Sequence, residues 1–221
     1  YNPAGLAAMK RFQAAGSHTS QFQGVSHKFA ALSVPLLSWV DSQKVKNANG
    51  VLGLAVYNLS VDEIERRGLV DTDTANETFE ASDFAYALSY AYAVPNTGLA
   101  LGATTKLITS KIDDKSASAY AMDLGGQYQQ GRLNLGLGVR NLGSGIKFVS
   151  ESDPLPLVIF SGAGMQFTES MLGTLEVDMP RDNKVTLGLG GEYRHQFAPK
   201  LAGSARAGYN TSRRDAGGIA G

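Results

Sequence analysis

The sequence predicts an all-β protein, an antiparallel up-and-down transmembrane β-barrel. Large and small side chains alternate with period two along successive segments, which is typical of strands with two unlike faces. Residues 83–92 show this most clearly: Phe84, Tyr86, Leu88, Tyr90 and Tyr92 share one parity, and Asp83, Ala85, Ala87, Ser89 and Ala91 share the other. A soluble sandwich buries its large residues, whereas a membrane barrel turns them to lipid and its small and polar residues to the lumen.

Strand length and loop length also favour the barrel. The expected strands span about 10–14 residues each, which suits a tilted membrane crossing better than the strands of ordinary sheets. We expect about ten of them, at 21–34, 51–60, 79–93, 97–112, 116–129, 132–142, 154–167, 171–179, 184–196 and 201–210.

The expected connections alternate in length, as they do in outer-membrane barrels. Long or polar ones lie at 61–80, 111–115 and 143–153, and tight ones at 95–97, 130–131 and 168–170. Residues 63–67 could form a short helix within the first long loop. The connector at 35–50 departs from the rule, because a tight turn is expected at that place.

The amino-acid composition excludes several classes of function. Charged residues make up 18% of the chain, below the roughly 25% of soluble domains. Lys plus Arg equals Asp plus Glu, at 20 each, so no nucleic-acid partner is expected. The chain has no cysteine, which excludes disulfides, thiolate metal sites and cysteine catalysis. No run approaches the ~18 apolar residues of a membrane helix, so a membrane crossing would use strands.

The remaining motifs favour structural interpretations. His18, His27 and His195 are far apart and keep no ligand spacing, so no metal site is expected. Asp71, Asp73, Asn76 and Glu77 crowd one loop, but an EF-hand would need Gly at Asn76 and Glu at Ser82, which makes a solvated loop the preferred interpretation over Ca²⁺ binding. Glycines that alternate with leucine inside strands do not make a phosphate loop. With no Gly-x-Ser-x-Gly element and no cofactor motif, the sequence predicts neither an enzyme nor a cofactor.

Charged side chains on the small face are more informative. They share the parity of the small residues in their strands and are Lys106, Asp123, Arg140, Glu176, Asp178, Glu192, Arg194 and Arg206. On a lipid face, each Arg or Lys near the midplane would cost ~2–4 kcal/mol, so we expect these groups to line the lumen. Their role there is either structural, through ion pairs or contacts with a plug, or part of a solute path. The aromatics Phe84, Tyr90, Tyr92, Tyr120, Tyr128 and Tyr193 are expected to form an interfacial girdle.

Several stretches resemble the PorV/PorQ-type outer-membrane proteins, a group similar to the FadL long-chain fatty-acid transporter superfamily. These are YNPAGLA (1–7), GVLGLAVYNLS (50–60), FAYALSYAYAV (84–94), LALGATTKLITSKIDDKSASAYAMDLGGQY (99–128), LNLGLGVRNLGSGIKF (133–148) and DPLPLVIFSGAGMQF (153–167). The resemblance implies a barrel of about fourteen strands whose N-terminal segment folds inside as a hatch, a plug that blocks the lumen. Residues 1–20 would be a remnant of that hatch, with Asn2, Pro3, Ala4, Gly5 and Leu6 in it, and 21–221 an incomplete barrel. A leader and some C-terminal strands are expected to be missing from the chain.

Two functions follow from this resemblance. The first is a FadL-like channel in the bacterial outer membrane that passes hydrophobic or small solutes. The second is an outer-membrane subunit of a secretion complex of the type IX kind, which would hold other outer-membrane or secreted proteins through loops 61–80 and 143–153. Membrane lipid is the expected partner in both cases. A soluble β-barrel or sandwich is a weaker third possibility.

Overall fold

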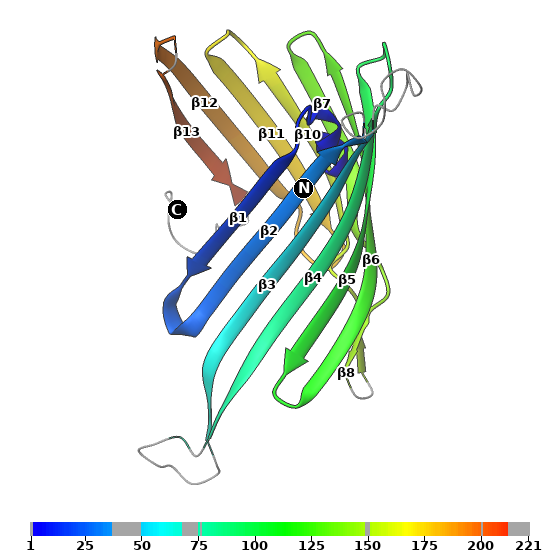
Figure 1. The fold of residues 1–221 in the computed structure, drawn as a ribbon, viewed down its shortest axis with the longest axis vertical. Coiled ribbons are helices and arrows are strands. Elements are labelled where there is room, and N and C mark those ends of the chain that lie inside the picture. The colour runs from blue at the N-terminus through cyan, green and yellow to red at the C-terminus, as the bar shows by residue number, and fades with distance from the viewer. Residues whose placement is uncertain are drawn as a thin grey trace.

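The computed structural model describes residues 2–36, 50–67, 75, 77–148, 151–199 and 201–211, and these form mainly one antiparallel sheet. Its eleven strands follow the order of the chain from β1 to β7 and then from β10 to β13. The sheet curls, so that β10–β13 form a second wall behind β1–β4 (Figure 1). The prediction of an all-β, up-and-down antiparallel barrel fold is confirmed.

The strands of the large sheet are β1 (Gln13–Ser20), β2 (Val25–Pro35), β3 (Gly50–Arg66), β4 (Glu77–Ala93), β5 (Leu99–Ile112), β6 (Lys115–Gln130), β7 (Leu133–Gly143), β10 (Val158–Gln166), β11 (Met171–Pro180), β12 (Thr186–Ala198) and β13 (Leu201–Asn210). A second, two-stranded sheet holds β8 (Ile146–Phe148) and β9 (Glu151–Asp153), and two 3₁₀ helices, η1 (Pro3–Ala8) and η2 (Phe22–Gly24), flank β1. Within these ranges, no helix is long and apolar enough to cross a membrane.

The two faces of the sheet differ as the alternation predicts. On the apolar face, the face that carries the large side chains, Leu88 is 52% exposed and Leu137 is 66% exposed. On the small-residue face, Ala91 and Ala119 are 0% and 1% exposed. Among the described residues, no large side chain is fully buried. The hydrophobic side chains therefore do not form a closed core, and the apolar face is free to contact lipid.

The predicted end of the hatch at residue 20 is wrong, because residues 13–20 form strand β1 of the sheet. Residues 13–20 were expected to belong to the hatch, but they pair with β2 along their whole length, from Gln13 opposite Ser33 to Ser20 opposite Ser26. The residues of β1 are small or polar on both faces, so they show no alternation in size. The backbone pairs because β2 offers unpaired amides and carbonyls along that edge.

The first long loop is shorter than predicted. Strand β3 continues to Arg66, and β4 begins at Glu77 rather than near Phe79. The helix expected at 63–67 is absent, because these residues pair with β4 after a bulge at which Glu63 takes a φ of 57°. Asp71, Asp73 and Asn76 of the acidic loop, for which a solvated loop is predicted rather than Ca²⁺ binding, lie outside the described residues, as does most of the connector at 35–50.

Two other connections differ from the expectation. The connection between β5 and β6, expected among the long or polar ones at 111–115, is a tight polar turn at Asp113 and Asp114. The loop expected at 143–153 contains the β8–β9 hairpin, and β10 begins at Val158 rather than at Pro154. The prolines at 154 and 156 explain the late start, because neither can donate a hydrogen bond to a neighbouring strand.

Candidate functional site

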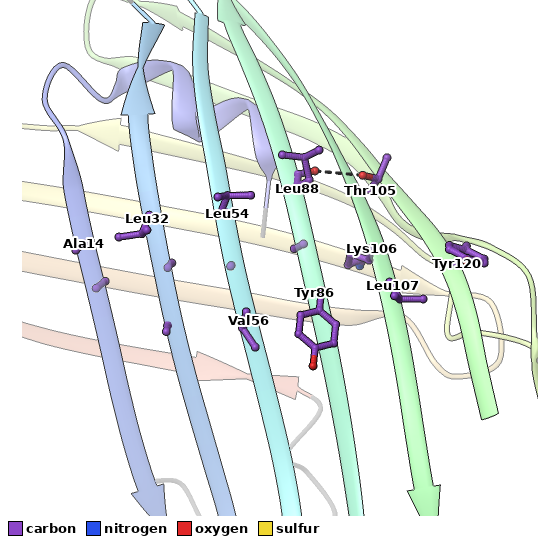
Figure 2. Close-up of a pocket in the computed structure, with 15 residues that line it drawn as sticks. Ala14, Leu32, Leu54, Val56, Tyr86, Leu88, Thr105, Lys106, Leu107 and Tyr120 are labelled. Carbon is purple, nitrogen blue, oxygen red and sulfur yellow. Dashed lines mark hydrogen bonds between the residues drawn. The ribbon is translucent and has the colours of Figure 1, made fainter. Parts of the chain in front are cut away.

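The N-terminal segment, residues 2–12, starts on the small-residue face. Helix η1 packs against β4, β5 and β6, and Pro3 and Ala4 are buried there. The side chain of Asn2 caps the helix, because its Oδ1 accepts a hydrogen bond from the amide of Ala4 at 3.0 Å. Its Nδ2 donates to the carbonyl of Gly126 at 2.9 Å, which ties the segment to β6. In Figure 2 the segment lies behind β2–β4, on the side opposite Leu54 and Leu88.

Glycines make room for this segment. A Cβ on Gly102 would stand 2.4 Å from the carbonyl carbon of Pro3, and one on Gly125 would stand 2.1 Å from Oδ1 of Asn2. Gly102 and Gly125 are paired across β5 and β6 and so form one continuous depression. The sequence pattern marks these glycines only as small residues of the lumen face. Their pairing in one row across strands is the signal that could have located the depression.

A cavity of about 650 Å³ adjoins the N-terminal segment. One side of it is apolar: Leu6 and Met9 come from the N-terminal segment, and Phe29, Tyr57 and Leu59 come from β2 and β3. The rings of Phe29 and Tyr57 contact each other with centroids 4.9 Å apart. This volume is within the range of sites for small organic ligands, ~300–1,000 Å³.

The other side of the cavity is polar. Nζ of Lys106 lies 2.7 Å from Oδ1 of Asp123, and the two side chains are only 15% and 11% exposed. The amide of Asn141 also donates to Oδ1 of Asp123, at 2.8 Å, and the side-chain oxygen of Asn141 accepts from Lys106. A bulge places Asp123 opposite both Arg140 and Asn141, with Asn141 in the left-handed region at φ 59°. The bulge brings the backbone amide of Asn141 within hydrogen-bonding distance of the Asp123 carboxylate.

A second ion pair lies beside the first. Arg140 donates to Oδ1 of Asp178 at 2.7 Å, and its guanidinium carbon lies 4.7 Å from the ring centroid of Phe160. The pairing of β7 with β10 and of β10 with β11 brings these three residues together across three strands. Lys106 and Arg140 therefore each have a carboxylate partner.

The segment between β7 and β10 folds over the small-residue face. Leu155 is buried with Ala119 and Ala121 of β6, and Ile108 and Ile146 pack against this cluster. Nδ2 of Asn141 donates to the carbonyl of Pro156 at 2.9 Å, so the segment is anchored beside the Lys106–Asp123 pair. Ile146 of the predicted loop 143–153 thus packs on the small-residue face, which the polar sequence of the loop did not indicate.

The other charged residues predicted for the lumen lie farther along the sheet. Glu192 and Arg206 form an ion pair of 2.7 Å between β12 and β13. Glu176 is opposite Gly188, and Arg194 is opposite Ser204. All four lie opposite small residues or each other across the strands. They do not line the cavity, whose described wall comes from the N-terminal segment and β1–β7.

The three histidines do not come together. His18 contacts the Ser20 hydroxyl at 3.1 Å on β1, His27 lines the cavity, and His195 packs between the rings of Tyr193 and Phe197 on β12. Within the part of the chain that the structure describes, no three His, Asp or Glu side chains gather as a metal-binding group.

No protein-family model and no curated protein matches the chain. Among solved structures, it is similar to the TodX deltaS2S3 mutant monoaromatic hydrocarbon channel, with a TM-score of 0.60 and 10% sequence identity. The match covers 95% of this chain and 76% of the channel. At this identity the likeness shows the fold alone, which is the β-barrel fold that the sequence predicts. It does not bear on the PorV-type resemblance.

Proposed function

We propose that this protein is a β-barrel of the bacterial outer membrane that passes small hydrophobic solutes. The observation that carries the proposal is the cavity of about 650 Å³, which has an apolar side and lies on the inner face of a curled sheet. A hydrophobic molecule that leaves water gains ~25 cal/mol for each Å² of apolar surface it buries in such a cavity. The likeness of the fold to a hydrocarbon channel agrees with this role.

The apolar face supports the membrane location. Leu32, Leu54, Val56, Tyr86 and Leu88 cover β2–β4, and a hollow of about 750 Å³ lies among them (Figure 2). Lys106, a neighbour of Leu107 in sequence, belongs to the opposite face and pairs with Asp123. A contiguous apolar surface of this kind is unfavourable in water and favourable against acyl chains.

The N-terminal segment is proposed to act as the hatch. Asn2, Pro3, Ala4, Gly5 and Leu6 are its first residues, and Leu6 forms part of the cavity wall. The segment is held by the two Asn2 hydrogen bonds and by close packing over Gly102 and Gly125. If these few contacts break, the segment can move away and the path through the barrel becomes wider.

Two neighbouring substitutions test the channel. Ala55→Trp places a large ring in the cavity, and Val56→Trp places the same ring on the apolar face. We expect Ala55→Trp to lower the uptake of radiolabelled toluene by cells that carry the protein in their outer membrane, and Val56→Trp to leave it unchanged. Equal uptake by both variants and the wild type, at equal amounts of folded protein, would contradict the proposal.

A second candidate is a scaffold for another outer-membrane or secreted protein, through the regions 61–80 and 143–153. It is favoured by the length of β3 and β4, 17 residues each, which exceeds what a membrane crossing needs. Near their ends Arg66 pairs with Glu77, at 3.2 Å, and with Asp113, so this projection has an ordered charged surface. Deletion of residues 68–75 distinguishes the two: loss of a co-purifying partner with unchanged toluene uptake supports the scaffold, and lost uptake with no partner supports the channel.

A further inference from the structure

We propose that the cavity accepts neutral molecules with an apolar or aromatic body and one hydrogen-bonding group, and discriminates against carboxylates of the same size. This inference rests on the proposed transport function and names the class of solute. It follows from two features of the cavity: its division into an apolar and a polar side, and the pairing of both cations of the polar side, Lys106 and Arg140, with carboxylates.

The apolar side receives the body of the molecule. Phe29 and Tyr57 present an aromatic pair whose rings are in contact, and Leu59 beside them is 42% exposed toward the interior. Aromatic solutes gain both from the apolar area and from ring–ring contacts, which contribute ~0.5–1.5 kcal/mol beyond the area alone. The apolar side is thus suited to a ring or a short chain.

The lysine and the arginine of the polar side are both paired with carboxylates, and the carboxylate of Asp83 also lines the cavity. Lys106 is neutralised by Asp123 at 2.7 Å, and Arg140 is neutralised by Asp178 at 2.7 Å and covered by the ring of Phe160. Asn141 is also engaged, because its amide contacts Asp123 and its side chain contacts both Lys106 and Pro156. Hydrogen-bonding capacity remains at carboxylate oxygens and at the hydroxyls of Ser89 and Thr104, which lie 2.7 Å apart.

This arrangement disfavours an anionic solute. A carboxylate that enters the cavity loses its hydration and finds both nearby cations already paired, so it must compete with an internal carboxylate. It also approaches Asp83 and Asp123, which line the cavity and repel it. A hydroxyl can donate to the same carboxylate oxygens, or exchange hydrogen bonds with the threonine and serine hydroxyls, without such repulsion.

The test compares three molecules with the same ring: toluene, benzyl alcohol and benzoate. Binding to the protein in lipid nanodiscs is measured by calorimetry at pH 8, where benzoate is ionised, and the heat from empty nanodiscs is subtracted. Benzyl alcohol is expected to bind at least about tenfold more tightly than benzoate, a difference of ~1.4 kcal/mol. Equal affinity for the alcohol and the carboxylate in the wild type would overturn the inference.

Charge variants give an independent test. Asp123→Asn leaves Lys106 without its carboxylate, and Asp178→Asn does the same for Arg140. Each variant should bind benzoate about tenfold more tightly than the wild type and benzyl alcohol with little change. Glu192→Gln is the control, because its ion pair with Arg206 lies away from the cavity. Benzoate affinity that stays the same in both variants, when each is folded by circular dichroism, would also overturn the inference.

The two proposals fail in different ways. If toluene and benzyl alcohol bind but benzoate binds equally well, only the inference about neutral solutes is wrong. If none of the three molecules binds and Ala55→Trp leaves toluene uptake unchanged, the channel function itself is wrong, and the inference falls with it.

Discussion

Gly125 lies so close to Asn2 that a Cβ on the glycine would stand 2.1 Å from Oδ1 of the asparagine. A contact this short cannot be accommodated without movement, and the same oxygen caps η1 through the amide of Ala4. The N-terminal segment can therefore pack against β6 in this position only because residue 125 has no side chain. This relationship gives a direct way to displace the segment without altering the apolar face.

We expect Gly125→Ala to displace the N-terminal segment. Because the wild-type chain has no cysteine, Ala4→Cys introduces a single reporter at a position that is 1% exposed. Addition of Gly125→Ala should increase the rate of maleimide labelling of Cys at position 4, and overpacking should cost ~1–3 kcal/mol of folding free energy. Gly126→Ala is the matched control, since its Cβ would meet Leu101 at 3.7 Å, an ordinary contact. Equal labelling rates in both variants would show that the segment is not held by this contact.

The Lys106–Asp123 pair should be more important for stability than the exposed pairs. Lys106→Met leaves the buried carboxylate of Asp123 without its cation, which should lower the free energy of unfolding by about 1–3 kcal/mol. Arg181→Ala breaks an exposed pair with Asp182 and should cost less than about 1 kcal/mol. Guanidinium unfolding in detergent micelles measures both values, and similar losses in the two variants would contradict the expectation.

Leu155 should anchor the segment between β7 and β10. Leu155→Ala removes most of the side chain that packs on Ala119 and Ala121, so we expect the segment to open more often and trypsin to cleave faster after Lys147. Ile159→Ala removes a similar side chain from the apolar face, where Ile159 is 50% exposed, and serves as the control. Unchanged cleavage in Leu155→Ala would show that other contacts, such as that of Asn141 with Pro156, are sufficient.

A charged side chain on the apolar face should hinder insertion into a membrane. Leu137→Arg places a guanidinium on this face and should reduce insertion into liposomes, with a cost of ~2–4 kcal/mol near the bilayer midplane. Asn134→Arg, on the same strand but on the small-residue face, should insert normally. The folded fraction is read from the heat-dependent mobility of the barrel in electrophoresis. A normal folded fraction for Leu137→Arg would contradict the membrane location.

The turn between β5 and β6 gives a prediction about pH. The hydrogen bond and charge of Lys115 hold the pKa of the Asp114 carboxyl below its ordinary value. A lowered carboxyl pKa contributes stability above the unfolded pKa of ~3.9, and this contribution is lost as the pH falls through the folded value. In Lys115→Met the pKa of Asp114 should return toward the ordinary value, while Lys111→Met should not change it. A carboxyl NMR titration of labelled aspartate measures the shift.

The sequence by itself determined the two faces of the sheet. Residues such as Tyr86 and Ala87 alternate, and side chains of a strand must point to opposite sides, so the exposure of Leu88 and the burial of Ala91 followed from local pattern alone. The up-and-down order followed for a similar reason, because short turns such as the one at Gly131 connect strands that are adjacent in the chain.

Only the tertiary structure decided what the small-residue face does. Strand β1 has no alternation and becomes a strand because β2 lies beside it. The closeness of Asn2 to Gly125, the Lys106–Asp123 and Arg140–Asp178 pairs and the inward fold of Leu155 depend on the register between strands. Register is set by many pairings at once and by the curl of the whole sheet, and a one-residue shift would send each of these side chains to the other face. Local patterns therefore identified which residues face inward, but not which of them meet.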